Sequence, residues 1–130
     1  MEKTKMPEPT NAAAPGRAET LVEAVNEAAR LMGLSQADVA RILGISEASA
    51  SRMVRGEWAP RENSSQWQLA LLLIRLFRSL DAIMAGDETA LQAWLRNDNR
   101  ALGAPPYRLI QSVEGLARTL AYVDSYRACA

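Results

Sequence analysis

The chain of 130 residues lacks several residue types on which enzyme active sites depend. It contains no histidine, which excludes serine–histidine triads and every metal site with histidine ligands. Its single cysteine, Cys129, can form neither an internal disulfide nor a four-thiolate zinc site. Its two lysines, Lys3 and Lys5, lie close to the start of the sequence, so the remainder supplies no lysine for a Schiff base or a P-loop. These absences indicate a binding protein without a cofactor or a metal ion rather than an enzyme.

An excess of either charge is also missing, because 15 basic residues balance 15 acidic ones. The whole molecule therefore has no field that attracts nucleic acid, and any such affinity must come from a local patch.

The most apolar window, Leu69–Ile74, is closed by Arg75 and Arg78 and is much shorter than the roughly 20 residues of a membrane span. No apolar stretch of signal-peptide length is present near the first residue, so we expect a cytoplasmic protein that does not bind membranes.

Helical periodicity dominates from Glu19 onward and no alternating strand pattern is present, which predicts an all-α fold. Residues 1–18 are rich in proline and alanine and are expected to form a flexible leader. Residues 19–62 are expected to form a helix-turn-helix bundle, 63–86 a long central helix and 87–130 a C-terminal helical domain. Capping residues and terminal glycines predict helices over 19–32, 36–43, 47–55 and 63–85, then a helix capped by Asp87 and, after a loop at 97–106, a last helical segment that restarts at Ser112.

The segment Ser35–Gly56 carries the most specific pattern in the sequence. Ser35 begins its first helix with a Ser-x-x-Asp capping box, and Ala40 is small where two helices must cross closely. Gly44 permits the left-handed conformation that the turn requires, and Ile45 is expected to fill the core beneath the turn. The residues predicted to face inward are Ala50, Met53 and Val54. The residues expected to face DNA are Ser35, Gln36, Glu47, Ala48, Ser49, Ser51, Arg52 and Arg55.

Small side chains at the start of the second helix of this segment, followed by arginines, suit entry into a major groove. The segment resembles the DNA-binding unit of the Xre/Cro-type repressors, which implies operator DNA as a partner. A helical hairpin with a glycine turn and no DNA partner is the alternative interpretation. Between Arg41 and Arg61, four arginines and two glutamates give a net charge of only +2, although phosphate neutralisation supplies much of the affinity for DNA. We therefore expect DNA binding to require a homodimer or a larger assembly.

The C-terminal third is expected to contain a tryptophan-bearing helix, a tight loop, and a helix pair with a glycine at a point of close approach. Its motifs are Ala93-Trp94-Leu95, Asn99-Arg100-Ala101-Leu102-Gly103-Ala104-Pro105 and Ser112-Val113-Glu114-Gly115. The C-terminal third resembles the toxin-binding domain of the MbcA/ParS/Xre antitoxins. Together with the helix-turn-helix, this resemblance covers about residues 20–127. One departure is Ala104, which stands where the family pattern has the second glycine of a pair. Structural roles are expected for Trp94, Leu102, Gly103, Pro105 and Gly115.

The resemblance implies a RES-domain toxin as the partner, an enzyme that either hydrolyses NAD or transfers ADP-ribose from it. It also implies that the chain covers the cleft of this toxin and represses its own operon, as a homodimer or within a toxin–antitoxin hetero-oligomer. The candidates for toxin contact are Asn99, Arg100, Tyr122, Asp124, Tyr126, Arg127 and Ala130. Tyr122 and Tyr126 lie four residues apart, so the alternative is that they merely close the helical bundle. The second hypothesis for the whole chain is a stand-alone Xre-family transcriptional repressor whose C-terminal helices serve dimerisation.

Overall fold

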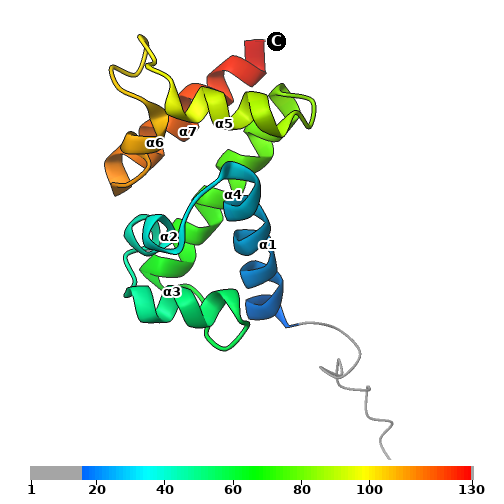
Figure 1. Cartoon of the computed structure of the whole chain (residues 1–130), viewed down its shortest axis with the longest axis vertical. Helices are drawn as coiled ribbons and strands as arrows, with labels where there is room; N and C mark the ends of the chain where they lie inside the picture. The colour runs from blue at the N-terminus through cyan, green and yellow to red at the C-terminus, as the bar shows by residue number, and fades with distance from the viewer. Residues whose placement is uncertain (1–15, 130) are drawn as a thin grey trace, which may run out of the picture.

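The computed structural model describes residues 16–129, which form seven helices and no strand (Figure 1). The predicted all-α fold class is therefore confirmed. The helices are α1 (Arg17–Met32), α2 (Gln36–Leu43), α3 (Glu47–Val54), α4 (Ser65–Ile83), α5 (Glu88–Arg96), α6 (Pro106–Leu109) and α7 (Val113–Cys129). Residues 1–15 of the expected leader, and Ala130, lie outside the described part of the chain.

The ends of α1 and α3 differ slightly from prediction. α1 begins at Arg17, before the expected start at Glu19, so the last residues assigned to the leader are helical. The carboxylate of Glu19 accepts a hydrogen bond from the backbone N–H of Gly16 at 2.9 Å, which stabilises this earlier start. α3 ends at Val54, and Arg55 is its C-cap rather than its last helical residue.

The central helix α4 is shorter than the predicted 63–85. Asn63 has a φ of 66° and Ala85 a φ of 53°, and neither value is compatible with a right-handed helix. Ser64 starts α4 instead, because its hydroxyl oxygen accepts a hydrogen bond from the backbone N–H of Trp67 at 3.1 Å.

Helix α4 is the element on which both halves of the molecule are built. In Figure 1 it runs through the middle, with α1, α2 and α3 around its beginning and α5, α6 and α7 around its end. Leu73, Leu76 and Leu80 are fully buried on it, and they belong to one continuous core that includes residues from α1, α2, α3, α5 and α7. Within residues 16–129, no helix is long and apolar enough to cross a membrane.

Two valines at helix ends are exposed, and one of them, Val54, was predicted to face inward. Val54 is 51% exposed at the end of α3, and Val113 is 61% exposed in the first turn of α7. Helical periodicity sets the face that a residue occupies, but not whether a neighbouring element reaches far enough to cover it. Both valines lie in the terminal turn of their helix, and the prediction that Val54 faces inward is wrong.

Candidate functional site

The first turn of α2 is organised by a capping box. The Ser35 hydroxyl oxygen accepts from the N–H of Asp38 at 3.0 Å, and Asp38 Oδ2 accepts from the N–H of Ser35 at 2.9 Å. Asp38 is buried, which raises the pKa of its carboxyl group. Hydrogen bonds from Tyr107 and Ser35, together with the charge of Arg41, outweigh burial and hold this pKa below its ordinary value. A charged carboxylate therefore holds this turn, on which Ser35 and Gln36 are exposed.

The turn of the helix-turn-helix depends on backbone conformation. Gly44 has a φ of 71°, and no atom lies within 4 Å of the position that a Cβ would occupy there. Ala40 is buried on α2, which packs against α3 and α4. Ile45 is half-buried and packs against the core. A larger residue at the glycine would therefore be strained in its backbone but would meet no neighbour.

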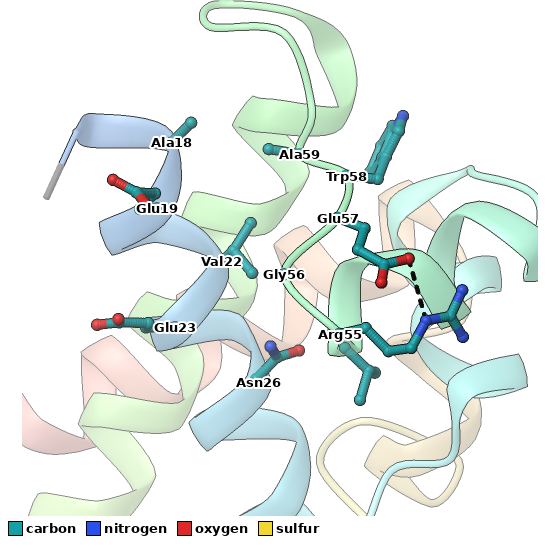
Figure 2. A pocket seen from close by; sticks show the side chains of 11 residues that line it. Ala18, Glu19, Val22, Glu23, Asn26, Arg55, Gly56, Glu57, Trp58 and Ala59 are labelled. Carbon is teal, nitrogen blue, oxygen red and sulfur yellow. Dashed lines mark hydrogen bonds and ion pairs between the residues drawn. The ribbon is translucent and has the colours of Figure 1, made fainter.

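The surface of α3 carries arginines that lie against their own helix. Among the residues expected to face DNA, Glu47, Ala48, Arg52 and Arg55 are exposed, whereas Ser49 and Ser51 are half-buried. Arg52 Nη2 donates to Ser49 Oγ at 3.2 Å, and Arg55 Nη1 donates to Ser51 Oγ at 2.8 Å. Arg55 Nε also forms an ion pair with Glu57 Oε1 at 3.1 Å (Figure 2). The charge of one of the two arginines is thus compensated within the chain.

A hollow of about 470 Å³ lies beside α3, between α1 and the loop that follows α3 (Figure 2). Its apolar lining includes Ala18, Val22, Val54, Trp58 and Ala59, and its acidic lining consists of Glu19, Glu23 and Glu57. Carboxylates repel phosphate, so the lining of this hollow does not suit contact with a DNA backbone.

The loop between α5 and α6 is shaped by its own polar groups. Asn99 Oδ1 accepts from the N–H of Leu102 at 3.0 Å, and the N–H of Gly103 donates to the Asn99 backbone oxygen at 2.7 Å. Gly103 has a φ of 84°, Leu102 is buried, and Pro105 is the N-cap of α6. The amide oxygen of Asn99 is therefore engaged inside the loop, whereas its neighbour Arg100 is exposed.

Gly115 lies where α7 comes closest to the end of α6. A Cβ added to Gly115 would overlap the backbone carbonyl group of Leu109. The Gly115 N–H donates to Ser112 Oγ at 3.1 Å, and its carbonyl oxygen accepts from Thr119 Oγ1 at 2.8 Å. Only glycine fits this backbone approach, which sets the angle at which α7 leaves the loop.

An apolar groove of about 370 Å³ opens at the end of α4 that is farther from the helix-turn-helix. It is lined by Leu80, Ile83, Met84, Trp94, Tyr122, Val123 and Tyr126. Tyr126 is 58% exposed, whereas Tyr122 and Trp94 are half-buried and pack against the core. Hence Tyr122 both closes the bundle and faces the groove, while Tyr126 is available to a partner.

Asp124 and Arg127 point toward α4 and are held by residues of the same chain. Asp124 Oδ2 forms an ion pair with Arg75 Nη2 at 3.1 Å, and its Oδ1 accepts from Ser79 Oγ at 3.3 Å. Arg127 Nη1 donates to the same Ser79 oxygen at 3.0 Å. The negative charge of Asp124 is therefore compensated by Arg75, and this polar cluster joins α7 to α4.

Sequence analysis missed Ile83 and Met84 and assigned Trp94 a purely structural role, although all three line the groove. The available signal was the apolar pair at the end of α4, directly before the break at Gly86. Within residues 16–129, no group of three or more acidic, cysteine or histidine side chains is placed to hold a metal ion.

Two family models match the chain. The model described as the antitoxin Xre-like helix-turn-helix domain matches residues 9–75, which is more than half of the chain. The model described as the antitoxin Xre/MbcA/ParS C-terminal toxin-binding domain matches residues 79–128, which include the loop after α5 and every residue that lines the groove. No curated protein matches the sequence.

Proposed function

Since the chain belongs to the Xre/MbcA/ParS-type antitoxins, we propose that it holds a toxin protein through the apolar groove at the end of α4. The observation that carries this proposal is the position of Trp94, Tyr122 and Tyr126 in one groove within the segment matched by the toxin-binding family. Tryptophan and tyrosine dominate the energetics of protein interfaces, because they bury a large apolar area with few rotatable bonds.

The toxin we propose is a RES-domain enzyme that uses NAD, and its inhibition follows from the C-terminal part of α7 covering its cleft. Tyr126 anchors the contact, and the exposed Arg100 and the polar groups of Asp124 and Arg127 lie on the same domain. The chain itself supplies no catalysis under this proposal, so the purified protein alone is expected to leave NAD unchanged.

The second part of the proposal is autorepression of the operon by the helix-turn-helix. On α3, Glu47, Ala48 and Arg52 are exposed beside the half-buried Ser49 and Ser51, and this mixture of small and hydrogen-bonding side chains suits a major groove. Because Arg55 is paired with Glu57, a single copy makes few contacts with phosphate. Repression therefore requires an oligomer, in which two copies bind the two half-sites of an operator and their contacts add.

A stand-alone repressor is the competing candidate, because the groove has the chemistry of a dimer interface as well as that of a toxin contact. Expression of the chain with the product of the neighbouring reading frame, followed by size-exclusion chromatography with light scattering, separates the two. We expect a stable hetero-oligomer with a RES-domain protein and suppression of its toxicity. A chain that forms only homodimers, and leaves growth arrest by the neighbouring protein unchanged, would contradict the antitoxin role.

Footprinting on the chain's own promoter, at several protein concentrations, tests the DNA-binding role. Protection is expected to rise more steeply than in proportion to protein concentration, because the binding species is an oligomer. Tight binding by one monomer would contradict the requirement for assembly.

A further inference from the structure

The turn between α1 and α2 is held by side chains from α5, which belongs to the toxin-binding half of the chain. Arg96 Nη1 donates to the Met32 carbonyl oxygen at 3.1 Å, and Arg96 Nη2 donates to that of Gly33 at 2.7 Å. Gln92 Nε2 donates to the Leu31 carbonyl oxygen at 3.0 Å. These carbonyl groups lie at the end of α1, where the helix supplies no N–H partner for them, so α5 acts as a C-terminal cap for a helix of the other half.

A second contact from the toxin-binding half reaches the first turn of α2. The Tyr107 hydroxyl group of α6 donates to Asp38 Oδ1 at 2.6 Å, which is the length of a strong hydrogen bond to a charged oxygen. The ring of Tyr107 lies beneath the guanidinium group of Arg96, 4.8 Å from its central carbon. Tyr107 therefore joins the two contacts into one cluster.

The charged and polar groups around Asp38 come from three helices. Arg41 of α2 donates to the same Oδ1 at 2.8 Å, and its Nε donates to Gln111 Oε1 at 2.9 Å, in the turn after α6. Tyr107 approaches from α6, and Arg96 of α5 lies on the far side of the tyrosine ring. Asp38 is thus surrounded by donors and positive charge, and its carboxylate carries both the capping box and the contact between the two halves.

We propose that Tyr107 is a positioning residue of the DNA-facing surface, which acts through Asp38 to fix the first turn of α2. This inference rests on the DNA binding proposed above. That turn presents Ser35 and Gln36, which are exposed and are the α2 residues expected to meet the DNA backbone. The hydroxyl group of Tyr107 donates its hydrogen bond to Asp38, so Tyr107 itself makes no contact with DNA. The toxin-binding half thus helps to fix the conformation of the helix-turn-helix.

The test is the affinity of the full chain for its own promoter fragment, measured by fluorescence anisotropy for wild type, Tyr107→Phe, Asp38→Asn and the double variant. Tyr107→Phe keeps the ring under Arg96 and is expected to weaken binding about fivefold, which corresponds to one hydrogen bond. The effect of Tyr107→Phe is expected to be smaller in the Asp38→Asn background than in the wild-type chain, because the tyrosine acts through this side chain and an amide oxygen is a weaker acceptor than a carboxylate. The slope of affinity against salt concentration is expected to stay unchanged, since no phosphate contact is lost.

Two further measurements are expected to change only if Tyr107 positions the first turn of α2. In Tyr107→Phe, hydrogen exchange at the amides of Ser35 and Asp38 is expected to accelerate in the free protein. The loss of DNA affinity on acidification is expected to begin at a higher pH than in wild type, because the carboxyl group of Asp38 has lost a donor that lowers its pKa.

Three results would overturn the inference. The first is wild-type affinity in Tyr107→Phe, and the second is a salt slope reduced by about one, which would make Tyr107 a phosphate contact. The third is a wild-type chain that binds its promoter no better than an unrelated fragment. In that case the proposed DNA binding falls as well, and the wild-type titration alone distinguishes this failure from the other two.

Discussion

The two ends of α4 present different surface chemistry, although both are built on the same core. Around the helix-turn-helix, the exposed side chains of α3 are Glu47, Ala48, Arg52 and a single apolar residue, Val54, and Arg55 is paired with Glu57. At the other end, an apolar groove displays Trp94 and Tyr126. Affinity for DNA grows with the number of phosphates contacted, whereas one desolvated aromatic anchor contributes much of the affinity for a protein. Under the proposed function, one copy of the groove is expected to hold a toxin, whereas several copies of the helix-turn-helix are expected to be needed to hold an operator.

The largest expected effect is on stability, and it differs between a glycine of the C-terminal half and a glycine of the helix-turn-helix. Gly115→Ala should destabilise the fold by about 3 kcal/mol, because the added methyl group overlaps the Leu109 carbonyl group. Gly44→Ala is the matched control in the helix-turn-helix, where φ is 71° and no atom lies within 4 Å, and backbone strain alone should cost about 1 kcal/mol. Urea denaturation followed by circular dichroism measures both. Equal losses in the two variants would contradict the close approach of α6 and α7.

The next effect concerns the groove. Tyr126→Ala should weaken toxin binding about 30-fold, or about 2 kcal/mol, because it removes an exposed aromatic anchor. Val113→Ala is the control, since it removes an exposed apolar side chain from the other end of the same helix. Calorimetric titration of the toxin with each variant gives the affinities. If Val113→Ala costs as much as Tyr126→Ala, the contact surface lies elsewhere on α7.

A smaller effect tests the cluster that joins the two halves. Tyr107→Phe should lower the free energy of unfolding by about 1.5 kcal/mol at pH 7, because it removes a hydrogen bond to a charged carboxylate. The pKa of Asp38 in the folded chain is held below its ordinary value, so the stability that it contributes is present above that ordinary value. This contribution disappears as the pH falls through the folded-state pKa, and the difference between the two proteins should shrink with it. A difference that persists unchanged at pH 2 would show that the hydroxyl group of Tyr107 stabilises the fold independently of the charge on Asp38.

The smallest expected effect concerns the charge on the recognition surface. Glu57→Gln removes the ion pair that holds Arg55 and should strengthen promoter binding about threefold, with a steeper dependence on salt. Glu23→Gln is the control, because Glu23 lines the same acidic hollow and forms no ion pair with a described residue. An equal gain in both variants would mean that general repulsion, rather than the release of Arg55, limits binding.

Local features of this fold could be predicted from sequence, because the atoms involved are close along the chain. The capping box of Ser35 and Asp38, the left-handed Gly44 and the restart at Ser112 each depend on residues within one helical turn. The shortened α4 was not predicted, since Asn63 and Ala85 adopt left-handed φ values that nothing in their residue types demands.

Tertiary contacts could not be predicted in the same way. Tyr107 and Asp38 are 69 residues apart, and no periodic pattern relates them. The groove depends on which apolar residues remain uncovered once α5 and α7 have packed on α4, so Ile83 and Met84 could be assigned to it only from the structure. The pairing of Asp124 with Arg75 likewise follows from helix packing, which turned a predicted toxin-facing acid toward its own chain.

The most direct test of the account is hydrogen exchange of the full chain in its complex with the product of the neighbouring reading frame, compared with the free chain. Binding through the groove predicts slower exchange at the end of α4 and along the second half of α7, with α3 unchanged. Protection confined to α3, with the residues around Trp94 and Tyr126 exchanging as in the free chain, would contradict the assignment of the two surfaces.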